Sequence, residues 1–303
     1  MKKLLLTGAS GFLGRHILRY PQNDWHIHGT YHENEPLEQG KFHQIDLTQK
    51  DRVEALFETL KPDAVIHTAA LSKAALCEQA PEFSYQINVE ASAWIATQCK
   101  KANIPLLFTS TNLIFDGKNA PYKESATPNP LSRYGTQKAE AESLILSNYP
   151  DATVCRMPLM YGILPDTNNF FLDWIYRLKN GNILTAFTDE YRTPVHAADA
   201  ARGLFLLLKK EKIGVWNMGG CESVSRYDFA MQMVEVFGFS KADVRALTQA
   251  ELNLSAPRPA DVSMDSSRAF ELGYQPDLPV DVFRKWTSSG KWENMSMKHE
   301  LNL

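Results

Sequence analysis

Residues 7–14, which read Thr-Gly-Ala-Ser-Gly-Phe-Leu-Gly, restrict the fold of this chain more than any other segment. An apolar run precedes them directly, and apolar residues at helical spacing follow. The first glycine permits a tight turn, the second lets the backbone approach a pyrophosphate, and the third lets helix and strand pack closely. They are Gly8, Gly11 and Gly14. Free N–H groups and the helix dipole hold an anion at such a turn. The segment is therefore predicted to bind a dinucleotide; the alternative is a turn that only shapes the fold.

Strand-like and helix-like segments alternate through the first half of the chain. Short β-rich runs predict strands at Lys3–Leu6, Trp25–Tyr31, Lys41–Ile45, Ala64–Thr68, Leu106–Ser110 and Thr153–Met157. Apolar residues at three-and-four spacing predict helices at Phe12–Tyr20, Asp51–Leu60, Pro81–Lys101 and Leu131–Ser147. This alternation predicts an α/β fold, a Rossmann doubly wound parallel sheet with helices on both faces, over residues 1–160.

The regular alternation stops at about residue 161. Helices are predicted near Asn169–Lys179, Ala197–Lys209, Ser225–Phe237 and Val280–Ser288, strands at Ile183–Phe187 and Gly214–Met218, and a proline-containing loop at Ala256–Pro259. These elements predict a smaller C-terminal α/β lobe, residues 161–303, that mainly binds substrate. Some of its segments are expected to return to the first domain.

The tip of the second strand bears on the choice between NADP and NAD. A NAD site usually places an acidic residue there for the adenosine ribose, whereas an NADP site needs positive partners for the extra phosphate. Here the strand ends at Tyr31-His32 without an acid, and Arg15 follows the glycine turn within reach of the phosphate. NADP(H) is therefore favoured, with NAD(H) as an alternative. His32 is equally well interpreted as a solvated loop histidine.

Further residues are predicted to line the dinucleotide because they lie in the glycine turn or at the carboxyl ends of strands. They are Ser10, Phe12, Leu13, Asp46, Leu47, Ala69 and Ala70. Small side chains after the fourth strand let the cofactor lie flat, and the third strand ends beside the adenine. Asp46 is an equally good N-terminal helix cap, since Thr48 follows it.

Tyr134 and Lys138 lie four residues apart in a predicted helix and therefore on one face of it. A free tyrosine has a pKa near ~10, so proton transfer at neutral pH requires a neighbour that favours the phenolate. Lys138 is predicted to supply that charge and to hydrogen-bond the ribose of a nicotinamide. The pair alone is weak evidence, because such pairs often form only a solvated helix face.

Thr111 strengthens the case because it ends an apolar strand, and ligands of open α/β sheets bind at the carboxyl ends of strands. It is predicted to hydrogen-bond a substrate carbonyl oxygen while Tyr134 protonates it. Without the glycine motif, Thr111 would be interpreted as a hydroxyl that caps a turn.

These three elements together resemble the extended short-chain dehydrogenase/reductase superfamily, over nearly the whole chain. Ser110–Gly117, Pro128–Lys138, Arg156–Pro158 and Pro257–Ser263 are similar to the dTDP-4-dehydrorhamnose reductase branch. The resemblance implies that Thr111, Tyr134 and Lys138 form the catalytic triad and that the three glycines bind the pyrophosphate. It also implies hydride delivery from NADPH to the C4 keto carbon of a nucleotide-bound 6-deoxy sugar.

The sequence also departs from that branch. Asn112 stands where the reductase commonly has aspartate, and the loop after Ala70 reads Leu-Ser-Lys-Ala instead of the usual sugar-site pattern. Related sugar 4,6-dehydratases carry an Asp-Glu pair after the threonine, so Asn112-Leu113 excludes their chemistry. Asn112 is predicted to bind substrate, with Arg192 and Arg258 as bidentate partners of a nucleotide diphosphate. Surface salt bridges are the alternative for both arginines.

Two other functions stay open. The superfamily includes the methionine adenosyltransferase beta subunit, a regulatory partner that binds NADP, and epimerases that retain NAD through the reaction cycle. The resemblance also implies a homodimer, built on the helices predicted at 81–101 and 131–147.

Composition narrows the partners and the compartment. The net charge is −3 with no basic stripe, which excludes nucleic acid as an expected partner. No apolar run reaches membrane-spanning length, and the N-terminal run is too short for a signal peptide, so a cytoplasmic protein is predicted. The four cysteines are far apart without a Cys-x-x-Cys pair, which predicts reduced thiols and no metal site.

Overall fold

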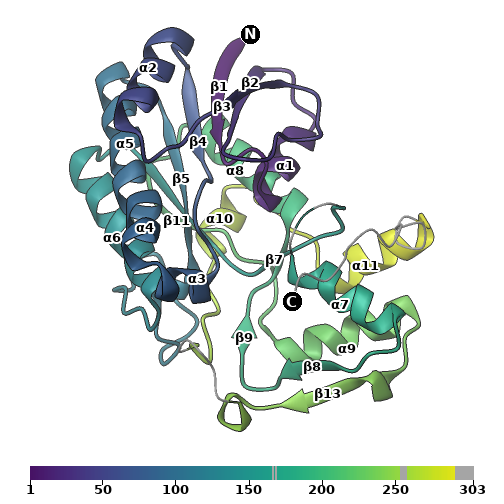
Figure 1. Cartoon of the computed structure of the whole chain (residues 1–303). Helices are drawn as coiled ribbons and strands as arrows, with labels where there is room; N and C mark the ends of the chain where they lie inside the picture. Colours follow the sequence, from purple (N-terminus) through teal and green to yellow (C-terminus); the bar gives the residue numbers. More distant parts are fainter. Residues whose placement is uncertain (166, 168, 253–257, 291–303) are drawn as a thin grey trace.

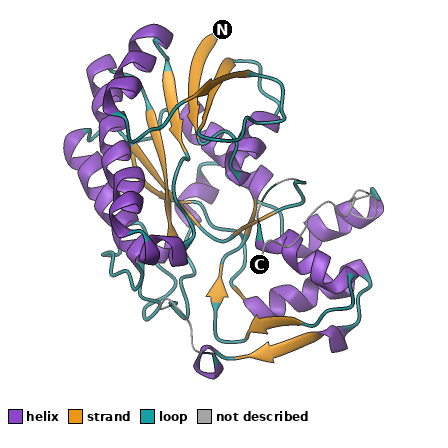
Figure 2. Cartoon of the chain, viewed as in Figure 1, coloured by secondary structure: helices purple, strands orange, loops and turns teal. Residues whose placement is uncertain are grey.

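The structure is a computed structural model that describes residues 1–165, 167, 169–252 and 258–290. Its central element is a seven-stranded sheet in the order β11-β6-β5-β4-β1-β2-β3, and every neighbouring pair is parallel (Figures 1 and 2). The strands are β1 Lys2–Thr7, β2 Trp25–Tyr31, β3 Lys41–Gln44, β4 Ala64–His67, β5 Leu106–Thr111, β6 Thr153–Met157 and β11 Gly214–Asn217. The predicted doubly wound α/β fold is confirmed.

Alternate residues of β1 enter two different hydrophobic cores, because successive side chains of a strand point to opposite faces. Leu4 and Leu6 pack with α1 (Phe12–Arg19) and α8 (Ala197–Lys209), whereas Leu5 packs with the helices of the opposite face. Those helices are α2 Lys50–Leu60, α5 Ala91–Ala102 and α6 Arg133–Asn148. Figure 1 shows the two helical layers on either side of the sheet.

The helix predicted at 81–101 is present, but it is not α-helical throughout. It consists of α4 (Pro81–Tyr85), a π-helical turn η1 (Gln86–Glu90) and α5, and a short helix α3 (Ala74–Gln79) that was not predicted precedes it. The π turn holds the buried Asn88, whose amide bonds the backbone of Leu71 and the side chain of Gln137. A local change of helical pitch at such a position lets one side chain reach partners in two other segments.

A third hydrophobic core, rich in aromatic residues, fills the C-terminal region. It lies between α7 (Phe170–Lys179), α9 (Arg226–Phe237) and α11 (Pro279–Ser288), with β8 (Leu184–Phe187) and β13 (Val244–Leu247) paired in parallel beside them. The remaining elements are short: β7 Met160–Tyr161, β9 Tyr191–Arg192, β10 Val195–His196, β12 Val224–Ser225, α10 Ser267–Glu271, and 3-10 turns η2 Asn112–Ile114, η3 Lys241–Asp243 and η4 Gln249–Glu251.

Part of the predicted C-terminal lobe packs with the sheet. β11 pairs with β6 at the sheet edge, and α8 packs on α1, so residues 197–217 belong to the N-terminal sheet domain in space.

Among the described residues, no helix combines the length and apolar character needed to cross a membrane. Cys77, Cys99 and Cys155 are buried and Cys221 is exposed, all as free thiols.

Candidate active site

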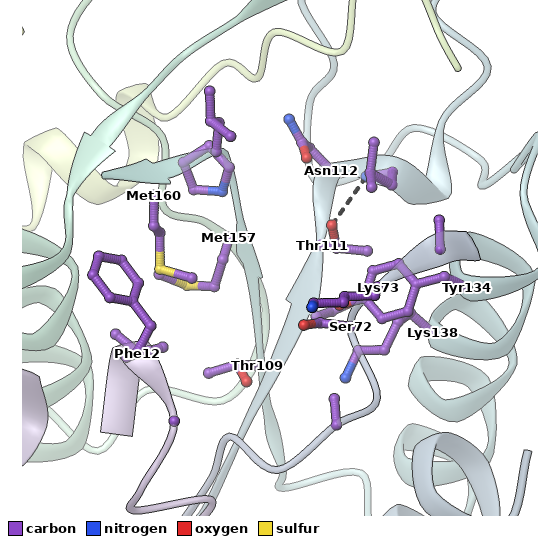
Figure 3. Close-up of a pocket in the computed structure, with 18 of the residues that line it drawn as sticks. Phe12, Ser72, Lys73, Thr109, Thr111, Asn112, Tyr134, Lys138, Met157 and Met160 are labelled. Atoms are coloured by element: carbon purple, nitrogen blue, oxygen red, sulfur yellow. Dashed lines mark hydrogen bonds between the residues drawn. The ribbon is translucent and has the colours of Figure 1, made fainter. Parts of the chain in front are cut away.

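A cleft of about 770 Å³ opens at the carboxyl ends of β1, β4, β5 and β6. Twelve of the predicted site residues line it: Gly8, Gly11, Phe12, Leu13, Gly14, Ala70, Thr111, Asn112, Tyr134, Lys138, Arg192 and Arg258. Figure 3 shows Phe12, Met157 and Met160 on one wall and Tyr134 and Lys138 on the other. The topology therefore brings together residues from the glycine turn, the triad and the C-terminal region.

The glycine turn leaves no room for side chains. A Cβ placed on Gly14 would lie 2.2 Å from the carbonyl oxygen of Gly8 and 2.8 Å from Cα of Ala9. The first turn of α1 carries no acidic residue, so the positive end of the helix dipole faces the cleft without a competing carboxylate. Among the described residues that line the cleft, none is Asp or Glu. This wall fits the pyrophosphate of a nicotinamide dinucleotide.

Replacing Gly14 by Val is expected to weaken NADPH binding strongly, because the added atoms force α1 away from β1. A Cβ contact of 2.2 Å with backbone cannot be relieved by a side-chain rotation. Fluorescence titration with NADPH measures the effect. Gly181→Val is the control, since a Cβ at Gly181 meets nothing within 4 Å. Gly181 has a positive φ of 68°, so the control measures backbone strain without a steric clash at the turn. Unchanged NADPH affinity in Gly14→Val would contradict the proposed role of the turn.

Tyr134 lies in the first turn of α6, which begins at the cap Ser132, whose Oγ accepts from the N–H of Gly135 at 3.2 Å. A Cβ on Gly135 would lie 2.2 Å from the carbonyl oxygen of Leu113. The glycine therefore lets the helix that carries Tyr134 approach the turn that follows Thr111. Lys138 comes one helical turn later, buried beneath the cleft, with its Nζ 3.9 Å from the centroid of the Phe108 ring.

The electrostatics of the pair differ from the sequence-based expectation that Lys138 favours the phenolate. Burial raises the pKa of Tyr134 well above its ordinary value, with the Cys77 thiol as a smaller contribution. Burial also lowers the pKa of Lys138 to about 7, against a smaller opposing effect of Glu142. Desolvation favours the neutral form of both groups. A neutral phenol is the form that donates a proton, which suits a reduction.

Thr111 does cap a turn, as its alternative interpretation held, but this leaves its proton available. Its Oγ1 accepts from the backbone N–H of Leu113 at 3.2 Å, at the start of η2 (Figure 3). No described residue accepts its hydroxyl proton, so that proton can be donated to a carbonyl oxygen in the cleft. Asn112 is buried, and its Nδ2 donates to the carbonyl of Val262 at 3.2 Å.

The remaining predicted cofactor residues lie outside the cleft lining: Ser10, Arg15, His32, Asp46, Leu47 and Ala69. Arg15, the predicted partner of the extra phosphate of NADP, is buried, and its Nε lies 3.0 Å from Oε1 of Glu38. Its charge is therefore balanced by a carboxylate that lies beyond the tip of the second strand. His32 is exposed and lies 3.7 Å from Glu33. Asp46 is not the helix cap of its alternative interpretation, because α2 begins at Lys50 after Gln49. Its Oδ1 accepts from the N–H and the hydroxyl of Thr48 in the turn before that helix. Burial acts to raise the pKa of Asp46, but the bonds from Thr48 outweigh it and lower that pKa.

Arg192 and Arg258 line the cleft and share one buried carboxylate, Glu190, at 3.6 and 2.5 Å. Arg192 also donates to the carbonyls of Pro259 and Ala260. Both arginines therefore form ion pairs, Arg192 as a buried residue and Arg258 as an exposed one. Pro257 and the first part of the predicted loop at 256–259 lie outside the described residues, whereas Arg258 and Pro259 are described.

Several residues of the cleft were not predicted. They include Thr68, Ser72, Lys73, Thr109, Ser110, Ser132, Met157, Met160, Asn169 and Phe170. Ser110 immediately precedes Thr111, and its Oγ is buried without a hydrogen-bond partner among the described residues. The strand-end rule that selected Thr111 was sufficient to find Ser110. Lys73 lies in the loop whose sequence departs from the usual sugar-site pattern, whereas Phe170 reaches the cleft only through the tertiary fold.

Comparisons with known proteins agree with this geometry. The model of a family described as the RmlD substrate binding domain matches residues 1–279. The chain is 32% identical over 284 residues to a probable low-salt glycan biosynthesis reductase of Haloferax volcanii, covering 91% of this chain and 95% of that protein. It is 29% identical over 290 residues to methionine adenosyltransferase 2 subunit beta of Bos taurus, covering 93% and 85%. A solved structure of a hypothetical dTDP-4-dehydrorhamnose reductase from Sulfolobus tokodaii superposes with a TM-score of 0.83 at 29% identity, covering 92% and 98%.

Proposed function

Because this chain belongs to the RmlD substrate binding domain family, we propose that it is a reductase that uses NADPH to reduce a nucleotide-linked keto-sugar. One observation carries the proposal: Thr111, Tyr134 and Lys138 line the same cleft as the glycine turn. The finer proposal is a nucleotide-diphospho 4-keto-6-deoxy sugar as substrate, supported by the similarity to the Sulfolobus tokodaii protein.

The residues divide the chemistry between them. When bound, the nicotinamide supplies a hydride to the carbonyl carbon. Thr111 donates its hydroxyl proton in a hydrogen bond to the carbonyl oxygen and so orients it. Tyr134 transfers its phenolic proton to that oxygen as the C–O π bond becomes a lone pair, which completes the alcohol. Lys138 holds the cofactor ribose, and Arg192 and Arg258 bind the diphosphate of the substrate.

The test is steady oxidation of NADPH, followed at its absorbance, with a panel of nucleotide-linked keto-sugars. We expect turnover with at least one 4-keto-6-deoxy sugar and none with the corresponding alcohols. NADPH binding without turnover of any member of the panel would contradict the reductase proposal.

The second candidate is a regulatory subunit, favoured by the similarity to methionine adenosyltransferase 2 subunit beta. Under this alternative NADPH binds, keto-sugars are not reduced, and the protein forms a stable complex with a separate catalytic chain. An epimerase is distinguished by NAD(H) that stays with the purified protein through gel filtration. The cytoplasmic location and the homodimer remain proposals of the same kind.

A further inference from the structure

Lys73 differs from the other cations of the cleft because its ammonium has no partner among the residues that the structure describes. The charged residues that line the cleft are Lys73, Lys138, Arg192 and Arg258. The two arginines pair with Glu190, and Lys138 is buried against the Phe108 ring. The exposed ammonium of Lys73 forms no ion pair or hydrogen bond with any residue that the structure describes. Figure 3 shows it in the cleft that Thr111 and Tyr134 also line, and α3, which begins directly after Lys73, packs on α6, the helix of Tyr134.

The backbone that carries Lys73 is fixed relative to the catalytic helix. Leu71 lies two residues before Lys73. Its backbone N–H donates to Oδ1 of Asn88 at 2.9 Å, and its carbonyl oxygen accepts from Nδ2 of Asn88 at 3.1 Å. The same Nδ2 donates to Oε1 of Gln137 at 2.8 Å, and Gln137 precedes Lys138 in α6. The carbonyl of Lys73 accepts from the N–H of Cys77 at 3.1 Å, at the start of α3. Only the side chain of Lys73 is therefore free to adapt to a ligand.

We propose that Lys73 is a specificity-determining residue that binds an oxygen substituent on the carbon next to the ketone of the sugar. The inference rests on the proposed reductase function, which places the ketone between Thr111 and Tyr134. The two arginines are assigned to the diphosphate end, which leaves Lys73, in the same cleft as Thr111 and Tyr134, available to the ring positions next to the ketone. A hydroxyl on such a carbon accepts from the ammonium, whereas a carbon without oxygen leaves the cation unpaired.

Lys73→Ala is expected to lower kcat/KM for a substrate with this hydroxyl by about ten- to a hundredfold, the loss of one charge-assisted hydrogen bond. For the analogue that lacks the hydroxyl, wild type and variant are expected to have equal kcat/KM. NADPH affinity should not change, because Lys73 is not assigned to the cofactor. Lys50→Ala, an exposed lysine outside the cleft lining, is the matched control.

A binding measurement separates failure of this inference from failure of the reductase proposal. Calorimetric titration of the nucleotide-linked alcohol into the protein–NADP complex requires no turnover. If wild type turns over no keto-sugar, the reductase proposal fails, and weaker binding of the hydroxylated alcohol by Lys73→Ala still supports the role of Lys73. Equal affinity and equal kcat/KM in wild type and Lys73→Ala for both ligands would overturn the inference.

Discussion

Tyr134→Phe is expected to lower turnover of the keto-sugar by about a hundred- to ten-thousandfold, the range that one general acid contributes. The substitution removes the phenolic oxygen alone and keeps the ring that packs in the cleft wall. Because burial raises the pKa of Tyr134, the phenol of the wild type stays protonated at neutral pH and is ready to donate. NADPH affinity is expected to stay unchanged, since the phenol is assigned to the substrate.

Stopped-flow measurement of NADPH oxidation and fluorescence titration of NADPH together test this prediction. Tyr85→Phe is the control: the same atom is removed from a tyrosine that donates to Glu140 at 2.6 Å outside the cleft lining. The control should retain wild-type turnover. Turnover in Tyr134→Phe within a few-fold of the control would refute the assigned proton donor.

Local patterns predicted the sheet well because its strands are short, apolar and bounded by turns. The predicted bounds of β2 and β6 agree with the structure, as do those of α8. The pattern of apolar spacing also predicted the helix at 81–101, but not its π turn. Apolar spacing gives no sign of a π turn, and the turn at Gln86–Glu90 carries long-range contacts from Asn88 to Leu71 and Gln137.

The site was predicted in the same uneven way. Gly14, Thr111, Tyr134 and Lys138 line the cleft, and the sequence pointed to them because each was selected by its position within one strand-turn-helix unit or one helical turn. The partners of charged residues were not found, because Arg15 meets Glu38 and Arg192 meets Glu190 across segments that only the folded chain brings together. The lowered pKa of Lys138 likewise results from burial, which the sequence pattern does not show.

Lys138→Met is expected to weaken NADPH binding by about ten- to a hundredfold and turnover by about a hundredfold or more, because we assign its side chain to both cofactor binding and catalysis. The variant should fold. The buried amine has a folded-state pKa of about 7, below its unfolded value of 10.5, so the folded state binds fewer protons and stability rises with pH between these values. Below pH 7 the full desolvation cost is present, and methionine removes it. Thermal stability of Lys138→Met at pH 7 is therefore expected to equal or exceed that of wild type.

The same pKa predicts a pH signature for the cofactor. As pH rises through about 7, the free protein loses the ammonium that the anionic dinucleotide favours, so the wild-type advantage in NADPH affinity over Lys138→Met should shrink from pH 6 to pH 9. Titrations of both proteins across this range measure the ratio of the two dissociation constants, and the common ionisation of NADPH cancels. A ratio independent of pH would show that Lys138 does not act on NADPH through its charge. If Lys138→Met is unfolded at pH 7, the buried lysine stabilises the fold, contrary to the expected thermal stability.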